Sequence, residues 1–256
     1  MSAPPGSPIA RSADPEGRAC LLAVETSTAT GSIAIVSPEG LVTELTLSVG
    51  GSHSDHVMGA IDFLLQRVSL RVDQLAGFAV SVGPGSFTGL RIGMATVKGL
   101  AEASALPLVA VPTLEALACN APAAGLPVCS ALDARKREVY AALYEWDENR
   151  EEWRPIMEEG AYAPADLAKQ LSDRGAPVIL LGDGACTYAK VFKQALGDHA
   201  RLAAGPANQP RAAWVGWLGL RRLASGQQGD PVTLVPRYLR PSEAEIAFSR
   251  RASKKG

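Results

Sequence analysis

Short apolar runs separated by polar turns open the chain. Runs at 20–25 and 31–36 enclose a hydroxyl-rich turn, and a third run at 41–47 follows the turn residues Pro-Glu-Gly. Runs of this length and composition, bounded by turn residues, predict three antiparallel β-strands. An amphipathic segment follows, which Ser52 or Ser54 can cap as a helix. Its apolar positions recur at helical spacing: Val57, Ile61, Leu64 and Leu65.

The rest of the first half alternates strands with helices. An apolar run at 76–82 precedes a glycine-rich segment, and an amphipathic stretch then continues to about residue 103. A short apolar run at 108–111 and helical spacing at 114–120 complete the unit. The predicted element order is βββαβαβα, which indicates an α/β unit built on a mixed sheet.

A second unit repeats the opening arrangement. It follows a junction at 122–127 that is rich in Ala, Gly and Pro. Apolar runs at 128–132 and 138–144 then flank an acidic and polar turn at 133–137. This pattern again predicts a strand, a turn and a returning strand.

Glu25 and Asp133 each end the first strand of their unit, so the architecture is duplicated although the sequence is not. The predicted lobes span 20–121 and 122–248. The later elements expected in the second half are a helix at 165–173, a strand at 178–181, a Gly-Asp-Gly turn into another helix, and an apolar helix from 211 to about 224.

Composition and charge narrow the class of protein. With 256 residues and 47% hydrophobic composition, the chain can bury a substantial core. Its 25 basic and 26 acidic residues give a net charge of −1, so no overall field attracts a polyanion, although a local basic patch stays open. The four cysteines lie far apart without a Cys-x-x-Cys pair, which predicts reduced thiols and a cytoplasmic location.

The two ends of the chain differ from its centre. Residues 1–19 are rich in Pro, Ser, Ala and Gly and contain Asp14 and Glu16, which is typical of a disordered leader rather than a signal peptide. Residues 249–256 form a basic tail, expected to be a solvated end rather than an RNA-binding arm. No apolar stretch approaches the roughly 20 residues that a membrane span needs.

The most informative segment is the glycine block at 83–93, which reads Gly-Pro-Gly-Ser-Phe-Thr-Gly-Leu-Arg-Ile-Gly. Backbone N–H groups at the start of a helix suit an anion or another chain's backbone. The spacing fits no standard nucleotide loop, because a G-x-G-x-x-G motif requires glycine where Thr88 stands. The residues of interest in this partner-binding or structural loop are Gly83, Gly85, Ser86, Thr88, Gly89, Arg91 and Gly93.

Individual residues of the glycine block allow more than one interpretation. A hydrolase elbow around Ser86 would also need glycine at Thr88, so we expect Ser86 and Thr88 to cap the following helix and Arg91 to display its charge. Gly89 and Gly93 lie four apart on one helical face, which allows close approach of another backbone. That backbone could belong to the chain's own sheet or to a partner helix, and both readings stay open.

Two turns are candidate remnants of phosphate-binding loops. Thr26 and Ser27 follow Glu25, and their hydroxyl and N–H groups could contact a phosphate or satisfy the turn's own backbone. Asp133 is followed by Ala-Arg-Lys rather than by a glycine pair, which disfavours an independent ATPase. His53 and His56 form a His-x-x-His pair at the start of the first predicted helix, but the sequence places no further ligands nearby, so no metal site is expected.

Four blocks of the chain stand out: LLAVETSTATGSIAI at 21–35, GPGSFTGLRIG at 83–93, LDARKREVY at 132–140 and PRYLR at 236–240. Together these blocks resemble the TsaB (YeaZ) family, which usually has Asp where this chain has Glu25. The resemblance implies the duplicated fold of actin, Hsp70 and sugar kinases (ASKHA), with a mixed sheet and flanking helices in each lobe and a reduced second lobe.

The resemblance also implies a function. It predicts a non-catalytic subunit of the machinery that makes N6-threonylcarbamoyladenosine (t6A) in tRNA, which binds and activates the catalytic TsaD subunit. The implied partners are a TsaD-like subunit, a TsaE-like ATPase, a second copy when the chain is alone, and tRNA through the complex. No cofactor of its own is expected, and ATP or ADP held at the joint with a partner stays open. The alternatives are a self-sufficient ATP-dependent kinase-like enzyme or a peptidase.

A comparison with TsaD sharpens the non-catalytic reading. TsaD carries a His-Leu-Glu-Gly-His segment whose two histidines ligate a metal, and the equivalent segment here is Thr-Leu-Glu-Ala-Leu at 113–117. Thr113 and Leu117 thus stand at the histidine positions. Because two imidazoles at i and i+4 grip one ion and these side chains cannot, the resemblance predicts no metal centre.

Overall fold

The computed structural model describes residues 20–48, 54–121 and 125–240. The predicted leader at 1–19, His53 and the predicted tail at 249–256 lie outside them. None of the described helices is both long and apolar enough to cross a membrane.

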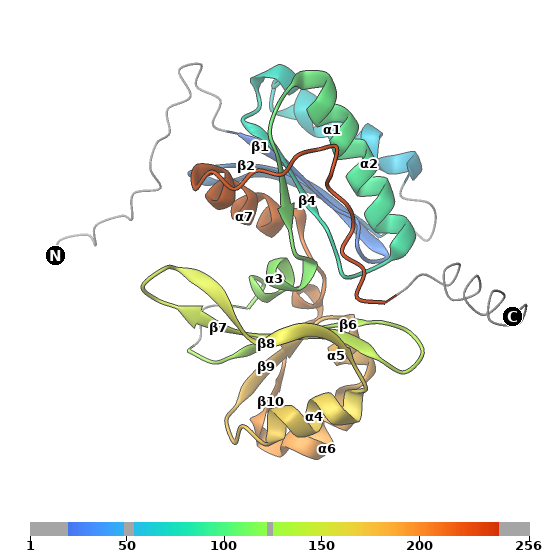
Figure 1. Ribbon diagram of the computed structural model, residues 1–256, viewed down its shortest axis with the longest axis vertical. Helices are drawn as coiled ribbons and strands as arrows, with labels where there is room; N and C mark the ends of the chain where they lie inside the picture. The colour runs from blue at the N-terminus through green and yellow to red at the C-terminus, as the bar shows by residue number, and fades with distance from the viewer. Residues whose placement is uncertain (1–19, 49–53, 122–124, 241–256) are drawn as a thin grey trace, which may run out of the picture. The chain divides into compact units, whose positions relative to one another are not determined.

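The first sheet has five strands in the order β3-β2-β1-β4-β5 (Figure 1). The β1 strand pairs antiparallel with β2 and parallel with β4, while β2–β3 is antiparallel and β4–β5 parallel. This is the mixed sheet that the element order predicts. Its strands are β1 (Leu21–Glu25), β2 (Thr30–Ser37), β3 (Gly40–Ser48), β4 (Gly77–Ser81) and β5 (Leu108–Val111).

Helices cover both faces of this sheet. Figure 1 shows α1 (Ser54–Arg67) and α2 (Phe87–Ser104) on the side opposite α7 (Ala212–Ala224). The α7 helix lies close to the strands because Gly216 and Gly219 face them: an added Cβ would stand 2.6 Å from Val36 and from Ala79, respectively. All of β1 and β4 is buried, as expected for strands covered on both faces.

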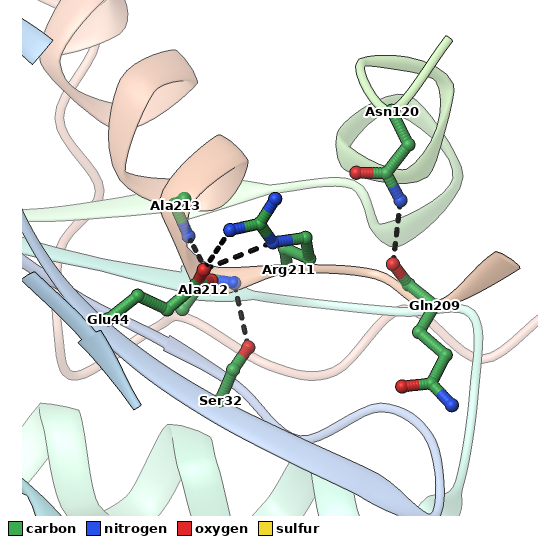
Figure 2. Close-up of polar contacts among 7 residues, drawn as sticks. All are labelled: Ser32, Glu44, Asn120, Gln209, Arg211, Ala212 and Ala213. Atoms are coloured by element: carbon green, nitrogen blue, oxygen red, sulfur yellow. Dashed lines mark hydrogen bonds and ion pairs between the residues drawn. The ribbon is translucent and has the colours of Figure 1, made fainter. Parts of the chain in front are cut away.

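Polar groups fix the start of α7 within the first unit (Figure 2). The Glu44 carboxylate accepts hydrogen bonds from Arg211 Nε and from the Ala213 N–H, both at 3.0 Å. The Ser32 hydroxyl accepts the Ala212 N–H at 2.8 Å. These acceptors satisfy N–H groups that the first turn of a helix leaves unbonded.

The second sheet repeats the strand order of the first, as β10-β9-β6-β7-β8. Again the first three strands are antiparallel and the last two run parallel to the first of them. Buried residues such as Phe192, Leu167 and Leu180 form its core. The strands are β6 (Val128–Asp133), β7 (Val139–Asp147), β8 (Glu152–Tyr162), β9 (Val178–Leu181) and β10 (Ala200–Leu202).

The predicted two-lobed α/β fold and its duplication are confirmed. The second sheet is not reduced, because both described sheets have five strands. What is reduced in the second lobe is the length of its helices. Those helices are α3 (Thr113–Ala118), α4 (Pro164–Ser172), α5 (Asp183–Thr187) and α6 (Ala189–Leu196). Short 3-10 turns occupy Val72–Gln74, Gly197–His199 and Gly205–Asn208.

The sequence did not predict β8 or β10. The β8 strand is rich in Glu and contains Pro155, and as an edge strand it needs neither an apolar run nor every backbone N–H. The β10 strand has only three residues, none of them fully buried.

The division into compact units departs from the predicted lobes at 20–121 and 122–248. One compact unit contains the first sheet and the other contains the second. Each unit is built from several separate segments of the chain. The helix α7 belongs to the first unit rather than to the second lobe, because its glycines pack on β1, β2 and β4. Among the described residues, the first unit comprises 20–48, 54–81, 92–111 and 211–235, and the second 82–91, 112–121, 125–210 and 236–240.

Candidate functional site

The glycine block begins beside the PRYLR segment, within the second unit. Gly83 has φ +110°, and an added Cβ would lie 2.7 Å from the Arg237 carbonyl oxygen. The Arg237 N–H donates to the Val82 carbonyl at 2.7 Å. Gly83 exchanges two bonds with Thr113, donating its N–H to the hydroxyl at 3.2 Å and accepting the Thr113 N–H at 2.9 Å. Two blocks separated by about 150 residues therefore meet, and Gly83 makes their contact possible.

An aromatic and cationic stack joins the same two blocks. The rings of Phe87 and Tyr238 stack with centroids 4.9 Å apart. The Arg91 guanidinium lies 3.8 Å from the Phe87 ring centroid, and its Nε donates to the Tyr238 hydroxyl at 3.0 Å. Arg91 is exposed, as predicted, but its charge is engaged by this cation–π contact rather than left to a ligand.

Ser86 caps α2, as the sequence predicts. Its hydroxyl accepts the Gly89 N–H at 3.3 Å, and its carbonyl accepts the Leu90 N–H at 2.9 Å. Thr88 lies within the first turn of α2 and is exposed, so it does not occupy the cap position that the sequence also predicted for it. Gly85 is half-buried ahead of the cap. The two serine bonds account for the position of Ser86 without a nucleophilic role.

Gly93 packs inside the first unit. An added Cβ would collide with the Thr26 hydroxyl oxygen and stand 3.3 Å from Val24 Cγ1. Gly89 is buried as well. Of the two readings of this glycine pair, close approach to the chain's own sheet explains Gly93.

Exposed apolar and small residues occur on α1 and α2, which lie on the same side of the first sheet, and the sequence reasoning missed them. Met58 and Phe63 of α1 are each 49% exposed. Gly59 on α1 and Gly99 on α2 have no heavy atom within 4 Å of an added Cβ. Ala95 of α2 is exposed too. We call these five residues the α1/α2 face. Apolar and small residues at exposed helix positions are the signal that could have identified it.

The first turn, between β1 and β2, is largely buried and makes hydrogen bonds within itself. Glu25, Thr26 and Ser27 are buried. The Ser27 N–H donates to Glu25 Oε1 at 2.5 Å, and the Thr28 hydroxyl donates to the Thr30 carbonyl at 3.0 Å. The hydroxyl-rich turn thus satisfies its own backbone, as one of the two sequence interpretations proposed.

The second turn, between β6 and β7, lies on the surface of its unit. The Asp133 carboxylate accepts the Arg135 N–H at 2.8 Å, and the Asp133 N–H donates to Asp183 Oδ1 at 2.8 Å. Burial raises the pKa of Asp183, and repulsion from Asp133 adds to this effect against opposing backbone hydrogen bonds. The carboxylates of Asp133 and Asp183 thus accept backbone N–H groups of the turn, while the basic residues of the turn are exposed.

Thr113 and Leu117 lie on α3 and are fully buried. Thr113 is bonded to Gly83, and Leu117 Cδ2 stands 3.1 Å from the position of a Cβ on Gly182. Both positions therefore serve packing. Among the described residues, no group of three or more His, Cys, Asp or Glu side chains is placed to hold a metal ion.

Comparisons with known proteins agree on one family. The family described as TsaD: tRNA N6-adenosine threonylcarbamoyltransferase matches residues 43–248. The tRNA threonylcarbamoyladenosine biosynthesis protein TsaB of Bacillus subtilis is 30% identical over 228 residues, covering 89% of this chain and 97% of the relative. Its Escherichia coli counterpart is 30% identical over 166 residues, covering 64% and 71%.

A solved structure shares the fold. YeaZ from Pseudomonas aeruginosa superposes with a TM-score of 0.74 at 28% sequence identity, and the match covers 86% of this chain and 100% of that one. Both lobes of the architecture described above are therefore found together in an experimental structure.

Proposed function

The chain belongs to the TsaB (YeaZ) family, and we propose that it is the non-catalytic subunit that docks onto a TsaD-like transferase and activates it during t6A formation in tRNA. Its part in t6A biosynthesis follows from the family. The docking and activating roles go further and rest on the structure of two regions, α3 and the α1/α2 face.

The main support for the non-catalytic role is that two residues of α3 are buried and used in packing. Resemblance to TsaD aligns Thr113 and Leu117 with two metal-binding histidines. Here both side chains are buried in the core, where one bonds to the glycine block and the other packs beside Gly182. A methyl-terminated side chain cannot ligate a metal, and a threonine already bonded to the backbone is a poor substitute for imidazole.

The α1/α2 face supports the docking role. Exposed Met58 and Phe63 supply apolar area, and the open positions above Gly59 and Gly99 let another helix approach closely. A related lobe with its own helix pair would fit such a face by pseudo-symmetric packing. We extend the proposal to a homodimer when the chain is alone, because a second copy presents the same face.

The docking test is a binding measurement with purified TsaD-like partner. Met58→Asp with Phe63→Asp should weaken the complex roughly 30-fold or more, since charged groups would replace central apolar contacts. Val232→Asp is the matched control, because Val232 is 78% exposed but lies outside α1 and α2. Absence of any complex with the wild-type chain on size exclusion, or equal losses for both variants, would count against docking at this face.

The rival functions make different predictions. A kinase-like enzyme would turn over ATP as the isolated chain and lose that turnover on Asp133→Asn or Glu25→Gln. A peptidase using Ser86 would lose its cleavage activity on Ser86→Ala. We propose that neither activity occurs, because Glu25 and Ser27 of the first turn are buried and bonded to each other, and Ser86 caps α2. Binding of a TsaE-like ATPase and of nucleotide at the joint belongs to the same proposal and is measurable with the reconstituted complex.

A further inference from the structure

The β6–β7 turn contains three consecutive non-glycine residues in the left-handed region. Arg135, Lys136 and Arg137 have φ values of +61°, +51° and +63°. Left-handed backbone in residues with a side chain normally occurs singly, because Cβ crowds the following carbonyl. Ser69, Ala105 and Glu151 are such single cases in the described part of the chain. A strained stretch of this length persists where the surroundings impose it, and such stretches concentrate at functional sites.

The surroundings of the turn impose its shape through backbone bonds. The Ala134 N–H donates to the Glu138 carbonyl at 3.0 Å, and the Glu138 N–H donates to the Arg135 carbonyl at 3.0 Å. In addition, the Asp133 carboxylate accepts the Arg135 N–H and the Asp183 carboxylate accepts the Asp133 N–H, each at 2.8 Å. The two carboxylates thus help to hold the backbone of the turn, and the three basic residues form the tip of the turn.

The PRYLR segment neutralises the remaining acid beside the tip. Arg240 Nη1 lies 2.7 Å from Glu138 Oε2 and 3.4 Å from the Ala134 carbonyl oxygen. The Arg135 side chain is 86% exposed and only loosely paired with Asp133, at 3.6 Å, whereas the Asp133 side chain is 19% exposed. The charge that reaches solvent at this turn is therefore positive, although the chain as a whole carries −1.

We propose that Arg135, Lys136 and Arg137, here called the basic tip, bind backbone phosphates of the tRNA that the complex modifies. The proposal rests on the proposed function, which brings the chain to tRNA. Phosphate contacts of this kind fix the position of an RNA without reading its sequence. A backbone already held in place loses little freedom on binding, which favours the contact.

The exposure of the tip distinguishes RNA from a free nucleotide, which offers the same phosphate chemistry. Small ligands bind in concave sites that cover most of their surface. All three residues of the tip are exposed. A long polyanion can contact such an exposed tip from outside, so the geometry favours RNA backbone over ATP.

The test uses the complete complex with the TsaD-like partner and an unmodified tRNA transcript. The variant Arg135→Gln/Lys136→Gln/Arg137→Gln removes three charges from the tip. Two controls accompany it: Arg135→Lys/Arg137→Lys keeps the charge, and Arg174→Gln/Lys193→Gln/Arg201→Gln removes three exposed charges elsewhere in the same unit. The tip variant should bind tRNA roughly tenfold more weakly at ~0.15 M salt, and its log–log salt dependence should be shallower by about 2 to 3.

Several results would overturn the proposal. They are unchanged affinity and salt slope in the tip variant, an equal loss in the Arg174/Lys193/Arg201 control, or a loss in the lysine control as large as in the glutamine variant. Loss of ATP binding with tRNA binding intact would assign the tip to a nucleotide. Loss of the complex itself on size exclusion would assign it to a protein partner.

Activity separates this inference from the proposed function. With the tip variant, KM for tRNA should rise about tenfold while kcat at saturating tRNA stays unchanged, because docking and activation do not involve the tip. If the wild-type complex fails to form, the proposed function fails independently. Should the glutamine variant not fold, Lys136→Gly/Arg137→Gly removes charge while relaxing the backbone, and the same tRNA measurements decide.

Discussion

The two hairpin turns occupy the same place in two sheets of identical strand order, yet their chemistry is opposite. The first, after Glu25, is largely buried, and the Ser27 N–H donates to the Glu25 carboxylate. The second, after Asp133, holds Arg135, Lys136 and Arg137 in a strained and exposed conformation. Because the topology is shared, the side chains decide that the first turn is largely buried and the second is exposed.

The largest expected effect tests whether α2 packs tightly against the first turn. Gly93→Ala places a Cβ against the Thr26 hydroxyl, so the free energy of unfolding should fall by about 2 to 3 kcal/mol. Gly99→Ala is the matched control, with open space around its Cβ, and should gain roughly 0.5 to 1 kcal/mol from helix propensity. Urea unfolding measures both, and similar values for the two variants would show that α2 does not press on the turn.

The carboxylates that begin the two turns should differ in their contribution. Glu25→Ala leaves the buried Ser27 N–H without this acceptor and should cost about 2 to 3 kcal/mol. Asp133→Ala leaves a more exposed Arg135 N–H that water can reach, so about 1 kcal/mol is expected. Equal costs in urea unfolding would contradict the contrast between a buried and a solvated turn.

Strain in the second turn predicts a gain in stability on substitution. Arg137→Gly removes the Cβ penalty at φ +63° and should raise the free energy of unfolding by about 1 kcal/mol. The same substitution should weaken tRNA binding by the complex, because it deletes one charge of the basic tip. A destabilised Arg137→Gly protein would show that the left-handed conformation is not strained.

The smallest expected effect is a pH dependence at Asp183. Since burial raises its pKa in the folded state, the folded protein holds this proton more tightly than the unfolded chain. The stability of the wild type relative to Asp183→Asn should therefore rise as pH falls through the raised pKa toward the ordinary range of Asp. A difference between the two proteins that is constant from neutral to acidic pH would contradict the shift.

Local chemistry explains which features could be predicted from the sequence. The strands of the first sheet follow apolar runs, and the cap at Ser86 follows from its position before a helix. Contacts between distant segments could not be predicted, such as Gly83 with Arg237 or α7 with the first sheet. The left-handed residues at 135–137 run against local propensity, so only the surrounding bonds reveal them.

A reconstituted threonylcarbamoylation assay measures whether this chain activates its TsaD-like partner. It compares the TsaD-like enzyme and its other partners without this chain, with the wild type, and with the Met58→Asp/Phe63→Asp variant. We expect little t6A without the chain, full activity with the wild type, and a loss with the variant that excess protein partly restores. Full activity without the chain, or t6A formation by the chain alone, would contradict it.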